Sequence, residues 1–130
     1  MRVAHLIIAH NAPEQLRRLI SRLEHPDSDI YLFIDLKADI VLFNILKDLP
    51  RVYFIKERIK IYWGEYSLVQ STLIGFKEIL ESGKSYDFIN FLSGSDYPLQ
   101  SSDKFHYFLL KHPENAFMEF YNIENVWQEA

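Results

Sequence analysis

The sequence predicts an α/β fold, with a Rossmann-like, mainly parallel sheet covered by helices on both faces. Its 130 residues are 48% hydrophobic, which suits one packed core. Short apolar segments rich in β-branched and aromatic residues alternate with segments whose apolar residues recur at helical spacing. Strands buried on both faces of a parallel sheet have this composition, and the alternation implies crossover connections between parallel strands.

The first half of the chain predicts two strand–helix units. A strand over 3–9 precedes a helix over 11–25, for which Asn11 is the expected N-cap and Glu14 the capping-box residue. The apolar face of this helix consists of Leu16, Leu19, Ile20 and Leu23. A strand over 30–34 and a weaker helical pattern over 40–49, which stops at Pro50, complete this half.

The second half predicts two more units and a last strand. A strand over 52–55 leads to a helix over 67–82, started by Glu65 or Ser67 and ended by Gly83. The residues expected to face inward from it are Leu68, Thr72, Phe76, Ile79 and Leu80. The remaining elements are a strand over 86–92, a helix after Ser101 and Ser102 that ends before Pro113, and a strand over 116–121.

The composition excludes several classes of function. A net charge of -4 without a Lys/Arg block gives little attraction for nucleic acid. There is no cysteine for disulfides, thiolate metal sites or a thiol nucleophile. No apolar run approaches the ~20 residues of a membrane span, and the N-terminus is typical of a strand rather than a signal peptide. We therefore expect a soluble, cytoplasmic protein.

Ligands of such sheets bind beyond the carboxyl ends of the strands, so the residues that follow each strand are the candidate site. The turn after the first strand has no glycine, which disfavours a dinucleotide loop, and no phosphate-binding P-loop motif occurs. His10 could contact a ligand or serve only as a local hydrogen-bonding group. Asp35 could accept ribose hydroxyl protons or cap the following turn. Tyr62, Trp63 and Tyr66 could stack on a base or sugar ring, and the alternative is that at least Tyr66 packs in the core.

A metal site has little support in the sequence. Asp27 and Asp29 have Asp-x-Asp spacing, but they precede the second strand and so belong to the opposite end of the sheet. They are interpreted as part of a solvated turn. The five histidines show no recurrent metal-binding spacing. We predict no protein-bound metal and no cofactor.

Four stretches, taken in order, carry a specific resemblance: AHLIIAHNAPEQLRRLI, YLFIDLKA, IYWGEYSLVQSTLIGFKEIL and YDFINFLSGSDYPLQS. Together they make the chain resemble the core-2/I-branching β-1,6-N-acetylglucosaminyltransferase family, or glycosyltransferase family fourteen, which includes peptide O-xylosyltransferases. The resemblance implies a type-A glycosyltransferase fold and an inverting, metal-independent transfer. The implied reaction moves N-acetylglucosamine or a related sugar from a UDP-sugar donor to a hydroxyl of a glycan acceptor.

The resemblance also implies roles for individual residues. The donor-binding residues would be Ala9, His10, Asp35, Tyr62 and Trp63 around the uridine, with Ser93, Gly94 and Asp96 beneath the sugar. Asp96 would fix its turn or touch the donor sugar. Glu119 would contact the acceptor.

The chain departs from the family at its end. In the family the catalytic glutamate and the cations that neutralise the leaving diphosphate come from a C-terminal half, whereas this sequence stops at Ala130. We expect residues 1–130 to be a single nucleotide-sugar-binding domain, truncated at its C-terminus, inactive alone and able to self-associate. A bacterial origin is expected. The alternative is a non-catalytic α/β module that binds a nucleotide or a partner protein.

Overall fold

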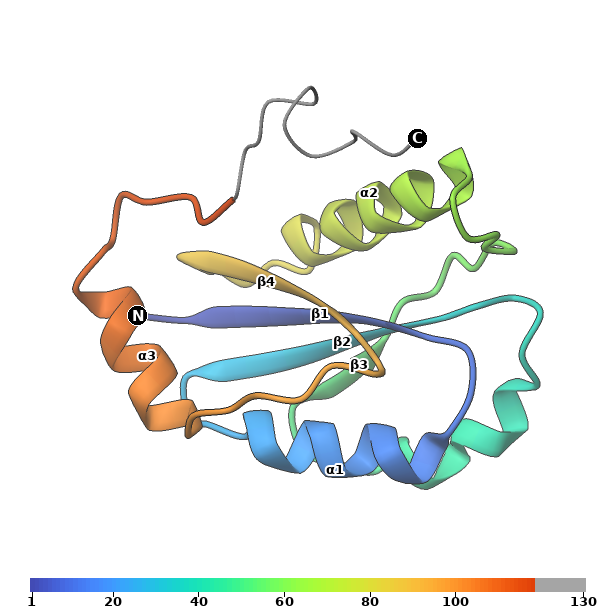
Figure 1. Ribbon diagram of the computed structural model, residues 1–130, viewed down its shortest axis with the longest axis horizontal. Coiled ribbons are helices and arrows are strands. Elements are labelled where there is room, and N and C mark those ends of the chain that lie inside the picture. The colour runs from blue at the N-terminus through green and yellow to red at the C-terminus, as the bar shows by residue number, and fades with distance from the viewer. Residues whose placement is uncertain (119–130) are drawn as a thin grey trace, which may run out of the picture.

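A computed structural model describes residues 1–118, which form a parallel sheet between two helical layers (Figure 1). In chain order the described elements are β1 (Val3–Ala9), α1 (Pro13–Leu23), β2 (Ser28–Ile34), η1 (Ile40–Leu46), β3 (Val52–Phe54), α2 (Tyr66–Leu80), β4 (Phe88–Ser93) and α3 (Ser102–Leu110). The strand order is β3-β2-β1-β4, and each neighbouring pair is parallel. The predicted Rossmann-like α/β fold is confirmed.

The alternation of side chains along β1 and β2 divides the core into two layers. On one face, α1 and the 3₁₀ helix η1 pack against the sheet (Figure 1), and the largest buried side chains there are Ile7, Leu16, Leu19, Leu32, Ile34, Phe43 and Leu46. On the other face lies α2, whose Ile79 is buried in one cluster with Ala4, Leu6, Tyr31, Phe33 and Ile55. β1 and β2 are therefore buried on both faces, as the sequence predicts.

Three predicted helices form close to their expected bounds. The predicted apolar face of α1 is buried, and Ser101 caps α3 by accepting a hydrogen bond from the Lys104 backbone N–H at 3.3 Å. The expected cap at Asn11 is wrong. Ala12 takes the N-cap position in a left-handed conformation, with φ 52°, and makes no side-chain cap bond. Here the tight exit from β1, rather than a capping side chain, starts the helix.

The predicted inward face of α2 is partly wrong. Ser71, Gly75 and Ile79 are buried against the sheet, whereas Leu80 is 73% exposed. The reason is close approach: a Cβ on Gly75 would lie 2.6 Å from Leu6 Cδ2, so only the smallest residue fits between helix and strand. Small side chains therefore face the sheet on part of this helix.

Three further expectations are corrected or lie outside the described part. The segment predicted as a helix over 40–49 is the shorter 3₁₀ helix η1. Its N-cap is Asp39, whose carboxylate accepts a hydrogen bond from the Val41 backbone N–H. β4 is only partly covered, in contrast to the prediction that it is buried on both faces. Residues 116–118 do not form the beginning of a strand, and the rest of the predicted fifth strand lies outside the described residues.

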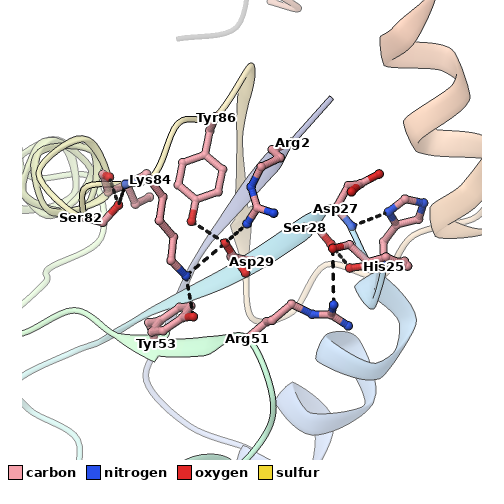
Figure 2. Close-up of polar contacts among 12 residues, drawn as sticks. Arg2, His25, Asp27, Ser28, Asp29, Arg51, Tyr53, Ser82, Lys84 and Tyr86 are labelled. Atoms are coloured by element: carbon pink, nitrogen blue, oxygen red, sulfur yellow. Dashed lines mark hydrogen bonds and ion pairs between the residues drawn. The ribbon is translucent and has the colours of Figure 1, made fainter.

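The interpretation of Asp29 as part of a solvated turn is also wrong. Asp29 lies on β2 at the amino end of the sheet, as predicted, but it is 1% exposed. Its Oδ2 accepts hydrogen bonds from Arg2 and Tyr86, each at 2.6 Å, and lies 3.5 Å from Lys84 Nζ (Figure 2). Burial would raise the pKa of Asp29, but Tyr86, Lys84 and Arg2 together lower it below its ordinary value.

Candidate functional site

A cleft of about 420 Å³ lies beyond the carboxyl ends of the strands. The chain leaves β1 for β2 on one side and later returns to pair β4 on the other side, so the strand order reverses at β1. A crevice forms at this point because the two connections diverge, and it is where open α/β sheets bind ligands. The residues that line it are Ile8, His10, Asp35, Lys37, Ile61, Trp63, Leu68, Phe91 and Ser93.

The Asp35 carboxylate organises one side of the cleft. Its Oδ1 accepts hydrogen bonds from the backbone N–H groups of Lys37, at 2.9 Å, and Ile61, at 3.3 Å. Its Oδ2 lies 3.2 Å from Lys37 Nζ. Asp35 is 3% exposed. Its hydrogen bond from the Lys37 N–H caps the following turn, which is one of its two predicted alternatives. Contact with a ribose stays a prediction.

Arg58 strengthens the same junction from the segment after β3. Its Nε donates to the Ile34 carbonyl oxygen at 2.9 Å, and its terminal nitrogen donates to the carbonyl oxygens of Asp35 and Ala38 at 2.9 and 3.0 Å. These backbone acceptors lie at and just beyond the end of β2. Arg58 therefore fixes the backbone from which the Asp35 side chain projects.

Trp63 forms an exposed aromatic wall. Its side chain is 95% exposed even though it lines the cleft. Gly64 follows with φ +76°, a conformation that glycine adopts without strain. Ser67 Oγ accepts a hydrogen bond from the Tyr62 backbone N–H at 2.8 Å. Tyr66 is 69% exposed, so the alternative that it packs in the core is wrong. A large indole that protrudes into solvent beside a cleft is suited to stacking on a flat ligand.

The turn after β4 closes the opposite side. Asp96 Oδ2 accepts the Ser93 backbone N–H at 2.8 Å, which holds the turn in shape. Gly94 N–H donates to the Ile8 carbonyl oxygen at 2.8 Å, and a Cβ at Gly94 would lie 3.0 Å from Ala9 Cβ. Asp96 therefore fixes the turn, as one predicted alternative stated, and it also lines a separate cavity of about 410 Å³ on the α1 side of β4.

The predicted donor-binding residues fall into two groups. His10, Asp35 and Trp63, from the segments after β1, β2 and β3, share the cleft with Ser93, the last residue of β4. Ala9, Tyr62 and Gly94 adjoin these residues in the chain, and Asp96 accepts a hydrogen bond from the Ser93 backbone N–H, but none of the four lines the cleft. Glu119 lies outside the described residues. Contact with a donor stays a prediction for all of them.

The sequence analysis did not identify Lys37 as a site residue. Its Nζ lies beside Asp35 and 4.5 Å from the centroid of the Tyr62 ring. The available signal was its position two residues after a carboxylate that ends a buried strand. Ile8 and Phe91 were missed because strand residues of this kind are ordinarily core residues.

Residues 1–118 contain no group of three or more His, Asp or Glu side chains arranged to hold a metal ion. The absence of a metal and of a cofactor from the active protein stays a prediction. No helix in this described range is both long enough and apolar enough to cross a membrane.

Comparison with known proteins identifies the family. The family model described as Core-2/I-Branching enzyme matches residues 3–129. A xylosyltransferase from Ciona intestinalis is 30% identical over 129 residues, which cover 96% of this chain and 15% of that protein. Xylosyltransferase 2 from Homo sapiens is 26% identical over 130 residues, 96% of this chain and 15% of that protein.

Xylosyltransferase oxt from Drosophila melanogaster is 28% identical over 123 residues, which are 92% of this chain and 14% of that protein. The chain thus spans about 15% of the length of the curated relatives it matches. These relatives are animal proteins and give no support to the expected bacterial origin, which stays a prediction. Because the family model covers nearly the whole sequence, the chain belongs to the Core-2/I-branching enzyme family.

Proposed function

We propose that the cleft binds the nucleotide of a UDP-sugar donor and that the chain is the donor-binding part of a glycosyltransferase. The observation that carries this proposal is the meeting of His10, Asp35, Trp63 and Ser93 at the reversal point of the strand order. Membership of the Core-2/I-branching family supports glycosyl transfer, and the names of the relatives favour xylose over N-acetylglucosamine as the sugar.

The chemistry of the walls suits a uridine. The exposed indole of Trp63 offers a flat face on which a pyrimidine can stack. Ile8, Leu68 and Phe91 contribute apolar surface to the cleft. The backbone around Ser93 is fixed by the Asp96 carboxylate and can hold a sugar–phosphate group without reorganising.

We further propose an inverting transfer without a protein-bound metal. In such a displacement a general base removes the proton of the acceptor hydroxyl while the diphosphate leaves from the opposite face of the sugar. The part assigned to this chain is binding and orientation of the donor. Binding, rather than turnover, is therefore the property to measure.

Isothermal titration of UDP, UDP-xylose and UDP-N-acetylglucosamine into the purified chain tests the proposal. We expect saturable binding of all three with the same affinity in EDTA as in Mg²⁺. Trp63→Ala should weaken binding about tenfold, the typical value of one base–aromatic stack. Tyr107→Ala, which removes an exposed aromatic ring of α3, serves as the control and should leave affinity unchanged. Absence of saturable binding, or no response to Asp35→Ala, would refute the proposal.

A further inference from the structure

Lys37 makes three contacts that join two segments far apart in the sequence. Its Nζ lies 3.2 Å from Asp35 Oδ2, donates a hydrogen bond to the Ile61 carbonyl oxygen and lies 4.5 Å from the centroid of the Tyr62 ring. The Nζ thus has an anionic partner, a hydrogen-bond acceptor and an aromatic face beside it. The side chain thus connects the end of β2 to the start of the aromatic wall.

The segment held by Lys37 is irregular, and it is also attached by Arg58 to the end of β2 and by Ser67 Oγ to the Tyr62 backbone. Between β3 and α2 the backbone forms no regular helix or strand. Leu36 N–H donates to the Ile59 carbonyl oxygen at 3.0 Å, and Ile61 N–H donates to Asp35 Oδ1 at 3.3 Å. Two residues later, Trp63 extends into solvent. Its position over the cleft therefore depends on how firmly Ile61 and Tyr62 are attached to β2.

Resting on the donor-binding function proposed above, we propose that Lys37 is a positioning residue that holds Ile61 and Tyr62 against Asp35 and so sets Trp63 over the cleft. The competing role for a lysine here is direct neutralisation of the donor diphosphate. The geometry favours positioning because the ammonium is already surrounded by a carboxylate, a carbonyl oxygen and an aromatic face.

Substitution of Lys37 can be tested without loss of the fold, because its side chain is 42% exposed and fills no core space. Lys37→Met keeps most of the apolar stem and removes the charge, whereas Lys37→Arg keeps the charge. Lys77→Met is a matched control on the outer face of α2. Thermal unfolding should show that all three variants remain folded.

The first measurement compares the dissociation constants of UDP and uridine by isothermal titration. If Lys37 positions the aromatic wall, Lys37→Met should lower the affinity for both ligands by the same factor. We expect about tenfold, for the loss of a charged hydrogen-bonded contact. Lys37→Arg should restore most of the affinity, and Lys77→Met should bind like the unmodified protein. A loss for UDP alone would assign Lys37 to the phosphates, and no loss for either ligand would show that it is dispensable.

The second measurement needs no ligand. NMR hydrogen exchange at the Ile61 amide reports attachment of the segment, and we expect exchange to accelerate in Lys37→Met but not in Lys37→Arg or Lys77→Met. Unchanged exchange at Ile61 would overturn the positioning role of Lys37 even if the unmodified protein binds UDP. Failure of the unmodified protein to bind UDP or uridine would instead refute the donor-binding function, together with the part of this inference that concerns Trp63.

Discussion

The imidazole rings of His25 and His106 stack face to face, with centroids 3.6 Å apart and planes inclined by 13°. Helix α3 lies beside the amino end of the sheet (Figure 1). Because His25 precedes β2 and His106 belongs to α3, the stack attaches the helix there. Ser102 Oγ reinforces the attachment by donating to the Glu24 carbonyl oxygen at 2.7 Å. Two positively charged rings at this distance would repel each other, so the stack packs best without charge on both.

The free energy of unfolding is expected to fall in mild acid because His5 and His106 have lowered pKa values in the folded protein. Burial, with His106 and His25 nearby, lowers the pKa of His5 from 6.5 to about 4. Burial and His25 also lower the pKa of His106, against the opposing effect of Asp27 and Asp103. Between pH 6.5 and 4 the unfolded chain therefore binds protons that the folded chain excludes, and the free energy of unfolding decreases as the pH falls.

For His5 alone the difference in pKa corresponds to about 3 kcal/mol once protonation is complete. Urea unfolding at pH 7 and pH 4 measures it, and His5→Gln, which cannot titrate, removes this contribution from the difference between the two pH values. His106→Phe keeps a stacking ring and should reduce the difference in the same direction. Equal pH dependence in all three proteins would contradict the prediction.

Asp29→Asn is expected to destabilise the fold and leave the cleft intact. The substitution leaves Arg2 and Lys84 without their anionic partner at the amino end of the sheet. Because both cations are partly exposed, we expect a loss of about 2 kcal/mol rather than the full value of a broken buried pair. Asp27→Asn is the control, and urea unfolding measures the effect.

The depressed pKa of Asp29 gives its contribution a definite pH dependence. The stabilisation is present above the ordinary pKa of an aspartate and is lost as the pH falls through the lower value of the folded state. The difference in stability between Asp29→Asn and the unmodified protein should therefore shrink in strong acid. A change in UDP affinity without a change in stability would contradict the structural role assigned to Asp29.

The sequence predicted the fold well where periodicity and burial agree. β1 and α1 have unambiguous apolar patterns, and their bounds came out within two residues of the predicted ones. The face of α2 was misjudged because its sequence is apolar around most of the helix, so periodicity does not select a side. The contact between Gly75 and Leu6 selects it, and that is a tertiary relationship.

The site was predictable to the extent that topology places residues. The rule that ligands bind beyond the carboxyl ends of parallel strands selected His10, Asp35 and Ser93 without knowledge of the strand order. It did not reveal that Asp35 is occupied by Lys37 and Ile61, because those contacts depend on the path of an irregular connection. Sequence patterns carry no information on such a path.

Gly75→Ala tests the close packing of α2 on the sheet. Alanine favours a helix by about 1 kcal/mol, but the new methyl group would lie 2.6 and 2.8 Å from the Leu6 methyl carbons. Since Leu6 is fully buried and overpacking costs about 1–3 kcal/mol, we expect a net destabilisation of roughly 1 kcal/mol. In a Leu6→Ala background the same substitution should stabilise the protein, and a double-mutant cycle by urea unfolding measures the coupling. Additive effects would contradict the proposed contact.

Gly94→Ala is expected to weaken donor binding through the shape of the cleft. The added Cβ would lie 3.0 Å from Ala9 Cβ, so the turn that begins at Ser93 must move away from the end of β1. Ser93 lines the cleft, and a movement of a few tenths of an ångström at a preorganised contact is expected to weaken UDP binding about fivefold. Ala9→Gly removes the obstructing methyl group, so the double variant should regain most of the affinity. If Gly94→Ala weakens binding equally in both backgrounds, the obstruction by Ala9 is not the cause, and the turn does not depend on this contact.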